Sequence, residues 1–506
     1  MLAWALWLGG AWIGRGGDGG QGLPRANPAR AGVSPAALLR FVEQLDSVDQ
    51  VHSVMVVRRG RVILEGWWAP YDAATPHELY SLSKTFTSTA VGLAVGEGRL
   101  AVDDPVLKFF PGEAPGSPGE NLRAMRVKDL LTMSTGHQEE APLSPAGLSA
   151  RAFLAQPVPH RPGTHFKYNT PATFLQSALV QSVTGETVRD YLQSRLFDPL
   201  GMGRPRWDTN FQGITLGGYG LRLRTEDLAK FGQLYLQQGR WRGRQLVPAE
   251  WVAAASAKQV SNGSNPASDW DQGYGYQIWR CRPGGYRGDG AFGQYCVVLP
   301  EQEAVVALTA AVRDMQGVLN GVWDHLLPAL SARTRGPARP AEQRALERRL
   351  QGLEVRRPQG RAGVPQAPPG VGRTYELAPN ALQWEAFELS PLAGGGWNWR
   401  RQIAGVWEDL PCGVDRWREG HGRPGVQPRG PVGPLGSEPL SAAAAWTGDD
   451  TLAIKVCVRE TPYQVTFTLQ FTGDEVAVTA ETNVGFGQTR PATLRGRAAR
   501  PPGAGR

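Results

Sequence analysis

Cysteine is rare in this chain and is not grouped with other metal-ligating side chains. The four cysteines show no C-x-x-C pair and no histidine–cysteine cluster, so a structural zinc site is not expected. Cys281 and Cys296 flank a glycine-rich hairpin. A disulfide between them stays an alternative to the free thiols that we expect, because no clear export signal places the chain in an oxidising compartment.

The N-terminus lacks the apolar length of a membrane span. Leu2 to Ile13 is apolar, but this run is too short to cross a bilayer, no basic residue precedes it and no clear A-x-A cleavage site follows it. A degenerate signal peptide, a short anchor and a misassigned start all stay open. The localisation is accordingly open between the cytoplasm and export to the periplasm or beyond.

The excess of basic residues is not spread over a surface suited to nucleic acid. The formal net charge is +8, but residues 331–362 alone contain nine Arg and three Glu, a local excess of six positive charges. The excess therefore belongs to one segment, and the rest of the sequence indicates no basic groove. No nucleic-acid partner is expected.

Lysine is scarce, and one lysine stands in a distinctive pattern. Of the seven lysines, only Lys84 has a serine, Ser81, three positions before it. Apolar residues repeat at helical spacing from Leu82 to Leu93, which puts Ser81 at a helix entrance and Lys84 one turn further along the same side. A lysine whose pKa is lowered by burial can activate a serine nucleophile, but a serine here can also be a plain N-cap.

Strand and helix patterns outline the first domain. Residues 1–29 form an apolar and glycine-rich leader, and residues 30–330 contain a hairpin at 52–65, a helical middle and three late strands at 274–280, 292–299 and 304–309. The stretch 283–290 is interpreted as the connection between the first two of these strands. The predicted fold class is α/β of the α+β kind, an antiparallel sheet flanked by helices with a helical subdomain.

Beyond residue 330 the character of the sequence changes. Residues 331–372 are rich in Arg, Pro and Gly and are interpreted as a linker with one short charged helix. Residues 373–497 carry strictly alternating apolar residues, for example from Tyr463 to Phe471, and predict a separate all-β sandwich or small barrel. Residues 498–506 are expected to be a disordered tail.

Four segments taken together resemble the serine β-lactamase-related family. They are Ser81-Leu-Ser-Lys84, Asp129 to Gly136, Pro162-Gly163 followed by Phe166-Lys167-Tyr168, and Gly290 to Tyr295. They follow the family's order within residues 30–330. The family includes class C β-lactamases, penicillin-binding DD-peptidases, esterases and oligomer amidases. The resemblance therefore implies a serine hydrolase with a β-lactamase/transpeptidase-like catalytic domain.

The resemblance also implies roles for individual residues. Ser81 would be the acylated nucleophile, Lys84 its base and Tyr168 a relay that passes protons to the leaving group. The backbone N–H groups of Ser81 and of Ala291, on the strand after Gly290, would form the oxyanion hole. No metal or other cofactor is required, and the implied partner is a small ester or amide substrate.

The match departs from the family pattern at two substrate-binding positions. Thr170 stands two positions after the motif tyrosine, where Asn is usual. The third motif reads Gly288-Asp289-Gly290, where Lys or His usually begins it, and Asp289 is interpreted as a turn residue with a second catalytic group as the alternative. Penicillins and D-Ala-D-Ala peptides are therefore expected to be poorer substrates than uncharged short esters or amides, unless Arg282 or Arg287 supplies a cation.

Other functions stay open beside this reading. A β-lactam- or peptidoglycan-binding sensor would be acylated at Ser81 without turnover, and a DD-peptidase-like protein would require export. A Ser-His-Asp hydrolase is disfavoured because the sequence has no G-x-S-x-G elbow, although His137 and His165 lie near the matched motifs. The aromatic segments 67–71 and 270–279 either line an apolar pocket or serve packing alone.

Overall fold

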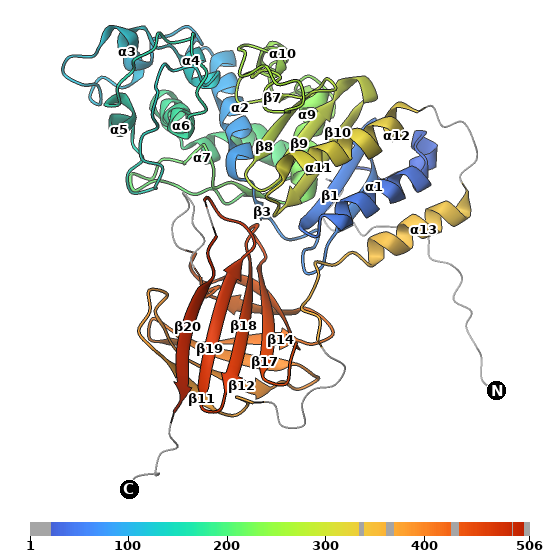
Figure 1. The fold of residues 1–506 in the computed structure, drawn as a ribbon. Helices are drawn as coiled ribbons and strands as arrows, with labels where there is room; N and C mark the ends of the chain where they lie inside the picture. Colours follow the sequence, from blue (N-terminus) through green and yellow to red (C-terminus); the bar gives the residue numbers. More distant parts are fainter. Residues whose placement is uncertain (1–21, 333–338, 361–368, 427–434, 488, 500–506) are drawn as a thin grey trace.

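The computed structural model describes residues 22–332, 339–360, 369–426, 435–487 and 489–499. Figure 1 shows a domain of helices around a sheet above a β-barrel, and the chain passes from one to the other by way of α13 (Pro340–Gln351). Most of the predicted leader and the predicted tail from residue 500 onward lie outside the described residues.

The first sheet has six strands in the order β2-β1-β10-β9-β8-β7, and all neighbouring strands run antiparallel. The predicted hairpin at 52–65 is confirmed as the pair β1 and β2, and the predicted antiparallel sheet is confirmed as well. The strands are β1 (Val51–Arg58), β2 (Arg61–Trp67), β7 (Trp279–Arg280), β8 (Tyr286–Gly290), β9 (Gln294–Leu299) and β10 (Ala304–Ala310).

Two of the late strands differ from the prediction. β7 keeps only the last two residues of the strand predicted at 274–280, because Gln277 takes a positive φ of 62° that interrupts the extended chain. The stretch 283–290, predicted as a connection, contains strand β8, whose five residues are all buried. Glycine normally weakens a strand. Residue propensities therefore do not predict a strand with glycine at two of its five positions.

Helices cover both faces of this sheet (Figure 1). Ser34 caps α1 (Pro35–Ser47) by accepting a hydrogen bond from the Ala37 N–H group, and the apolar side of α1 packs in a buried cluster with α13 and the helices of residues 315–331. On the other face, α2 (Ser83–Gly96) and α9 (Thr225–Leu236) belong to a second buried cluster. The helices of residues 315–331 are α11 (Met315–Gly321), η6 (Val322–Leu326) and α12 (Leu327–Ser331).

The predicted helical subdomain lies beside α2 (Figure 1). α6 packs against α2, α4 and α5, and α4 ends at Leu131, shortly before Met133, which takes a positive φ of 57°. The elements of this region are α3 (Glu120–Ala124), α4 (Val127–Leu131), α5 (Ala150–Leu154), α6 (Thr170–Thr184), α7 (Val188–Leu192) and α8 (Asp198–Leu200). η3 (Val106–Phe109) packs against α3 and α6 in this region. Further short elements of the first domain are β3 (His77–Glu78), β4 (Arg222–Leu223), β5 (Arg240–Trp241), β6 (Arg244–Gln245) and α10 (Ala249–Ser256).

Of the two architectures predicted for the C-terminal part, the structure has the barrel. Nine strands of the described residues, β11–β14 and β16–β20, form a closed ring, because the parallel pair β14–β16 joins the two ends of an otherwise antiparallel sheet. β15 adds to β16 beside this closure. The bounds are β11 (Thr374–Leu377), β12 (Trp384–Pro391), β13 (Trp397–Ile403), β14 (Val406–Gly413), β15 (Arg418–Gly422), β16 (Glu438–Trp446), β17 (Thr451–Val458), β18 (Gln464–Thr472), β19 (Glu475–Thr482) and β20 (Ala492–Ala498).

The segment predicted as a linker is partly folded onto the first domain. The short charged helix expected there is α13, and its Leu346 is buried in the same cluster as α1. Leu353 and Val355, which follow α13, are buried in that cluster too. The exact domain boundaries stay predictions.

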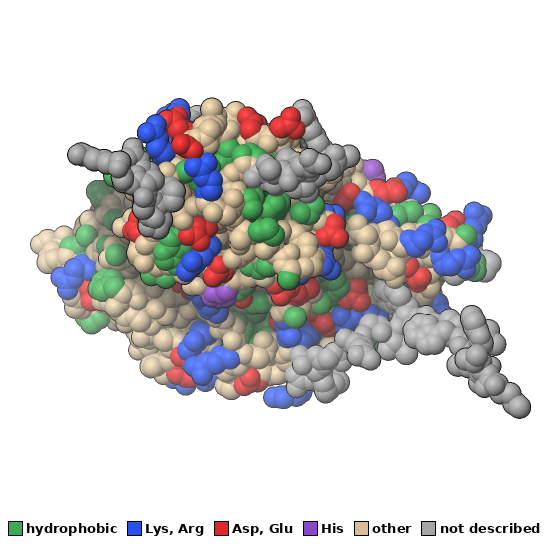
Figure 2. Space-filling view, turned by 90° about the horizontal axis from the view of Figure 1, so that it is seen from below, with side chains coloured by type: hydrophobic (Ala, Val, Ile, Leu, Met, Phe, Trp, Pro, Cys, Tyr) green, Lys and Arg blue, Asp and Glu red, His purple; other side chains and the backbone are tan. Residues whose placement is uncertain are grey.

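The face seen from the barrel side carries Lys and Arg side chains interspersed with Asp and Glu (Figure 2). Among the described residues, no helix has the length and apolar character needed to cross a membrane.

Candidate active site

Ser81 and Lys84 lie next to each other at the start of α2. Ser81 belongs to a short 3-10 turn (Tyr80–Leu82) that leads directly into the helix, and Lys84 is on the first helical turn. Lys84 Nζ lies 3.0 Å from Ser81 Oγ and donates a second hydrogen bond of 2.8 Å to the carbonyl oxygen of Gly218. The N-cap of α2 is Leu82, so Ser81 does not cap this helix and its hydroxyl is bonded to the amine instead.

Burial sets the protonation of the Lys84 amine. Lys84 is 1% exposed, and this burial lowers its pKa from 10.5 to about 7, while the charges of Glu140 and Asp289 act in the opposite direction. At neutral pH a large share of the amine is therefore unprotonated. An unprotonated amine within hydrogen-bonding distance of a hydroxyl can accept its proton.

The turn that carries Ser81 has a strained backbone held by a buried carboxylate. Tyr80 takes a positive φ of 47°, a conformation that costs a non-glycine residue about 1–2 kcal/mol. The Glu78 side chain accepts hydrogen bonds from the backbone N–H groups of Tyr80 (3.2 Å) and Gly220 (2.9 Å). Glu78 thus ties the serine turn to the loop whose Gly218 carbonyl binds Lys84.

Tyr168 lies against the same lysine. It precedes α6, and its ring centre is 5.0 Å from Lys84 Nζ. The ring stacks on Trp279 at 5.5 Å and meets Tyr274 edge-on at 6.4 Å. Burial and then the charge of Asp289 raise the pKa of Tyr168 well above its ordinary value, although a hydrogen bond with Ser81 acts the other way. The phenol is therefore protonated at neutral pH.

Thr170 begins α6, and its neighbour Asn169 caps that helix. The Asn169 side-chain oxygen accepts a hydrogen bond of 3.1 Å from the Ala172 N–H group. Thr170 lies beside Gly218: a Cβ atom placed on that glycine would be 2.7 Å from Thr170 Cγ2 and 3.5 Å from Lys84 Nζ. Thr170 and the Lys84 amine therefore both lie beside Gly218, while Asn169 is used as a cap.

β8 packs directly against the serine turn, and its glycines make this possible. A Cβ atom on Gly290 would lie 2.0 Å from the carbonyl oxygen of Leu79, and one on Gly288 would lie 2.8 Å from Thr85 Oγ1. Neither site has room for a side chain. Ala291, expected on a strand after Gly290, instead begins the turn from β8 to β9, so the prediction of its local structure was wrong.

Asp289 was interpreted as a turn residue, and this was wrong as well. It lies within β8, is 6% exposed and forms an ion pair of 2.9 Å with Arg287, which is also buried. Burial raises the pKa of Asp289, and the charge of Arg287 opposes that rise. The pairing offsets the charge of the carboxylate within the protein, so Asp289 repels a substrate carboxylate less than an unpaired aspartate would.

The two arginines considered as substrate cations are already engaged. Arg287 donates to the carbonyl oxygens of Asp269 and Arg280, both at 3.0 Å, besides its ion pair with Asp289. Arg282 forms an ion pair of 2.9 Å with the Asp269 carboxylate. Each guanidinium group therefore binds a carboxylate within the protein.

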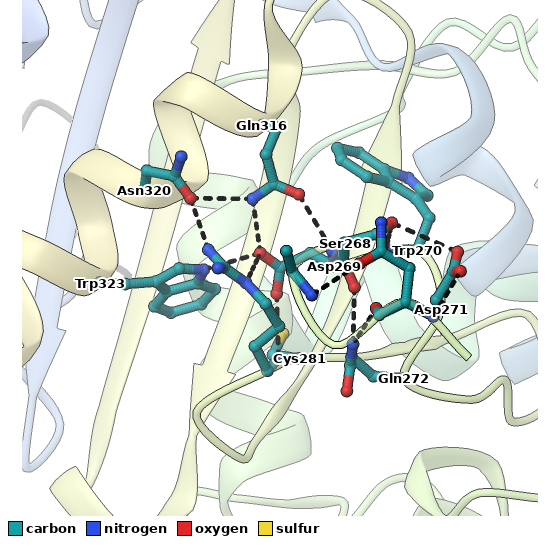
Figure 3. Close-up of polar contacts among 12 residues, drawn as sticks. Ser268, Asp269, Trp270, Asp271, Gln272, Cys281, Gln316, Asn320 and Trp323 are labelled. Atoms are coloured by element: carbon teal, nitrogen blue, oxygen red, sulfur yellow. Dashed lines mark hydrogen bonds and ion pairs between the residues drawn. The ribbon is translucent and has the colours of Figure 1, made fainter. Parts of the chain in front are cut away.

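Asp269 anchors the loop that precedes β7, and Figure 3 shows the polar side chains around it. Its carboxylate accepts hydrogen bonds from Gln316 (2.7 Å) and Trp323 (2.9 Å) in addition to Arg282. This cluster fixes the following residue, Trp270, whose ring lies 5.0 Å from the Arg287 guanidinium. Gln316 of α11 and Trp323 of η6 therefore help to hold Trp270 in place beside the Arg287–Asp289 ion pair.

The two aromatic segments have different places. In 270–279, Trp279 borders Tyr168, so this segment does line the region of Lys84. In 67–71, the Trp68 indole donates to Asp46 and Tyr71 stacks on His52 at 3.7 Å. Segment 67–71 therefore serves packing.

The histidines considered for a triad have other contacts. His137 is buried, bonds Thr135 at 3.0 Å and packs on Phe153, and burial lowers its pKa to about 4. His165 stacks on His160. Neither arrangement supplies Ser81 with a base.

Three residues of the site were missed from the sequence. Gly218 lies in the run Leu216-Gly217-Gly218-Tyr219-Gly220, whose glycines signal a tight loop but not a lysine ligand. Glu140 carries no local signal, because it reaches the site only through the tertiary fold. Glu78 stands three positions before Ser81, but no sequence pattern marks a carboxylate that bonds the Tyr80 N–H group. Burial raises the pKa of Glu140, and the charge of Lys84 opposes the rise.

The positions of the cysteines bear on the disulfide and the metal site considered from the sequence. All four cysteines are buried as free thiols, and Cys281 and Cys296 lie in different core clusters on opposite faces of the sheet. Among the described residues, no three His, Cys, Asp or Glu side chains are grouped so as to hold a metal.

Comparison with known proteins finds several relatives. The 6-aminohexanoate-dimer hydrolase of Paenarthrobacter ureafaciens is 25% identical over 345 residues, covering 61% of this chain and 88% of that protein. Protein flp of Staphylococcus aureus (strain MW2) is 26% identical over 166 residues, covering 30% of this chain and 33% of that protein. The chain thus matches only about a third of the length of the staphylococcal relative.

Among solved structures, the octameric penicillin-binding protein homologue from Pyrococcus abyssi aligns with 91% of this chain and 99% of its own, at 16% identity and a TM-score of 0.47. A family model described as Beta-lactamase matches residues 41–322, which is more than half of the chain and includes Ser81, Lys84, Tyr168 and Ala291. The chain therefore belongs to the beta-lactamase family of serine hydrolases.

Proposed function

We propose that the protein hydrolyses an ester or amide bond through an acyl-enzyme on Ser81, with Lys84 as the base. The observation that carries this proposal is the 3.0 Å contact between Lys84 Nζ and Ser81 Oγ together with a lysine pKa of about 7. Tyr168 is the weaker candidate for the base, because its pKa is raised and it holds its proton at neutral pH. The assignment of the two groups follows from these opposite protonation states.

The acylation step uses these groups in order. Ser81 Oγ attacks the substrate carbonyl carbon while its proton passes to Lys84 Nζ, and the carbonyl π electrons move onto oxygen. The N–H groups of Ser81 and Ala291 stabilise that oxyanion, a contribution of typically about 2.7–4 kcal/mol for one such donor. As the carbonyl reforms, the leaving group departs with a proton relayed through Tyr168 from the lysinium. Water then attacks the ester, and the same steps in reverse return Ser81.

Thr170, Gly290 and Asp289 have different parts in this proposal. Gly290 lets β8 approach the serine turn, and Thr170 lies beside Gly218, whose carbonyl oxygen binds the Lys84 amine. Asp289 raises the pKa of Lys84 and is not itself a proton donor to substrate, because it is paired with Arg287.

An uncharged ester or amide is the proposed substrate class. The guanidinium groups of Arg282 and Arg287 are bound to carboxylates of the protein, which leaves the motif without a cation for a substrate carboxylate. A charge-assisted hydrogen bond typically contributes about 1.5–3 kcal/mol, so its lack disfavours penicillins. The named activity of the Paenarthrobacter relative, hydrolysis of an amide-linked dimer, supports the inclusion of amides.

Covalent labelling tests the proposal. We expect intact-mass analysis after exposure to a fluorophosphonate to show one adduct on Ser81, and we expect Ser81→Ala and Lys84→Ala to abolish hydrolysis of p-nitrophenyl butyrate. Ser88→Ala is the matched control, because Ser88 is a buried serine of α2 whose hydroxyl forms no hydrogen bond to any described residue. Hydrolysis at the wild-type rate by purified Ser81→Ala would refute the mechanism, and a burst without turnover would favour a sensor.

A further inference from the structure

One turn of the barrel is docked on the turn that carries Ser81. The segment between β17 and β18 supplies the carbonyl oxygen of Glu460, which accepts a hydrogen bond of 2.8 Å from the Glu78 N–H group. The hydroxyl of Tyr463 accepts a hydrogen bond of 2.6 Å from the hydroxyl of Tyr80, and both residues are buried. The residue immediately before the nucleophile is therefore fixed by the second domain.

An ion network strengthens the same junction. Arg222, which is buried and belongs to β4, lies 2.8 Å from the Glu460 carboxylate and 3.3 Å from that of Glu438, and both glutamates belong to the barrel. It also lies 3.6 Å from Glu78, the carboxylate that holds the serine turn. These largely buried ion pairs fix the position of the barrel relative to the catalytic residues.

Aromatic rings from both domains meet at the edge of the site. Phe292 follows Ala291, and its ring meets the Tyr80 ring edge-on at 5.5 Å. From the barrel, Phe486 lies 5.7 Å from Tyr80 and 5.0 Å from Phe292. The cluster thus touches the chain neighbours of both N–H groups that are assigned to the oxyanion hole.

Phe486 differs from its partners in one respect. Its side chain is 42% exposed, whereas Tyr80 is 2% exposed and Phe292 is half-buried. Part of the Phe486 ring is covered by the cluster, and the remainder is exposed, within ring-to-ring contact of Tyr80 on the nucleophile turn. Covering the exposed part of this apolar ring with an alkyl or aryl group of a bound molecule is favourable, because it removes apolar surface from water.

We propose that the barrel domain completes the acyl-binding site and that Phe486 contacts the apolar part of the acyl group. The occupant is thus an ester or amide whose acyl chain extends several carbons beyond the carbonyl. Tyr463 is a positioning residue that acts through Tyr80 on the serine turn. This inference rests on the proposed Ser81 acyl-enzyme and adds its acyl preference.

A chain-length series tests the inference in the full-length protein. We measure kcat/KM for p-nitrophenyl esters from acetate to decanoate in the wild type, in Phe486→Ala and in Phe486→Gln. Both variants should lose roughly 10-fold at octanoate and change little at acetate, because the lost contact lies beyond the first carbons. Val414→Ala is the control, since Val414 is also 42% exposed and belongs to the same barrel outside the cluster.

The outcomes separate contact from positioning. Tyr463→Phe should lower kcat/KM by the same factor at every chain length. An equal loss at all lengths in the Phe486 variants would make Phe486 a positioning residue only, and no loss would remove it from the site; either result overturns the proposal. A wild type that neither hydrolyses any ester nor reacts with a fluorophosphonate at Ser81 would refute the proposed function instead. If Ser81 reacts without turnover, labelling rates for ethyl and octyl fluorophosphonates give the same comparison.

Discussion

The protonation of Lys84 can be tested by removing one charge near it. Glu140 is the largest of the influences that raise the pKa of this buried lysine against its desolvation. Glu140→Gln keeps the shape of the side chain and removes the charge. The pKa of Lys84 should then fall, because the cationic form loses an attractive partner. The active, unprotonated form should therefore persist to lower pH.

The size of the effect follows from the pKa of Lys84 and from the partial exposure of Glu140. With a pKa of about 7, half of the amine is unprotonated at pH 7, whereas at the ordinary value of 10.5 the share would be roughly 3 in 10,000. Glu140 is half-buried, so solvent screens its charge and we expect the pKa to fall by roughly half a pH unit. At pH 6 this raises the unprotonated share roughly two- to threefold.

The assay is the pH dependence of kcat/KM for an uncharged ester between pH 5 and 9. This parameter reports the ionisation of the free enzyme, and because the two groups interact, its acid limb in the wild type belongs to the Lys84–Glu140 pair. Glu139→Gln is the matched control, since Glu139 is exposed and is not among the charges that act on Lys84. An acid limb that stays in place or moves to higher pH in Glu140→Gln would refute the assignment, as would a wild-type profile that is flat around pH 7.

Three further outcomes are expected from the structure. Lys84→Met should be inactive but more stable at pH 7. The lowered pKa of the buried amine costs roughly 4 kcal/mol of folding free energy at that pH, and the lost hydrogen bonds to Ser81 and Gly218 offset about 1–3 kcal/mol of this gain. Urea unfolding measures the change, with Lys108→Met as the exposed control, and a less stable Lys84→Met would contradict the expectation. Gly290→Ala should lose most activity while Gly119→Ala, where a Cβ meets nothing within 4 Å, stays active; equal activities would show that β8 need not approach Leu79 so closely. His77 should account for roughly 2 kcal/mol of stability lost between pH 7.5 and 5, because burial lowers its pKa to about 4 while the unfolded chain binds the proton below about pH 6.5; in urea unfolding the fall should be smaller by about this amount in His77→Gln, and an equal fall would contradict the assignment.

Features that depend on local sequence were predictable. The helix after Ser81, the hairpin at 52–65 and the alternating strands of the barrel follow from apolar periodicity, which reflects burial on one side of an element. The proximity of Ser81 and Lys84 follows from their three-residue spacing, from the 3-10 turn into the first turn of α2. These relations hold within a few residues, so the sequence contains them directly.

Features that depend on contacts between distant segments were not predictable. β8 has glycine at two of its five positions, and only the nearness of Leu79 and Thr85 explains why. Asp289 looked like a turn residue because its partner Arg287 becomes buried only once the strand is in the sheet. Likewise Glu140 reaches Lys84 from a loop with no pattern of its own.

The cost of building this site explains why two domains meet at it. The turn before Ser81 has a positive φ at Tyr80, Lys84 is buried with its pKa lowered to about 7, and burial raises the pKa of Glu78 to about 7 beside the buried Arg222. Each of these features destabilises the fold by itself. Tyr463 and Glu460 bond the same turn from the barrel, and Arg222 finds its nearest carboxylate on Glu460. The barrel therefore stabilises a conformation of the catalytic turn that the first domain alone would hold less firmly, and a change that loosens the junction should reduce catalysis before it unfolds either domain.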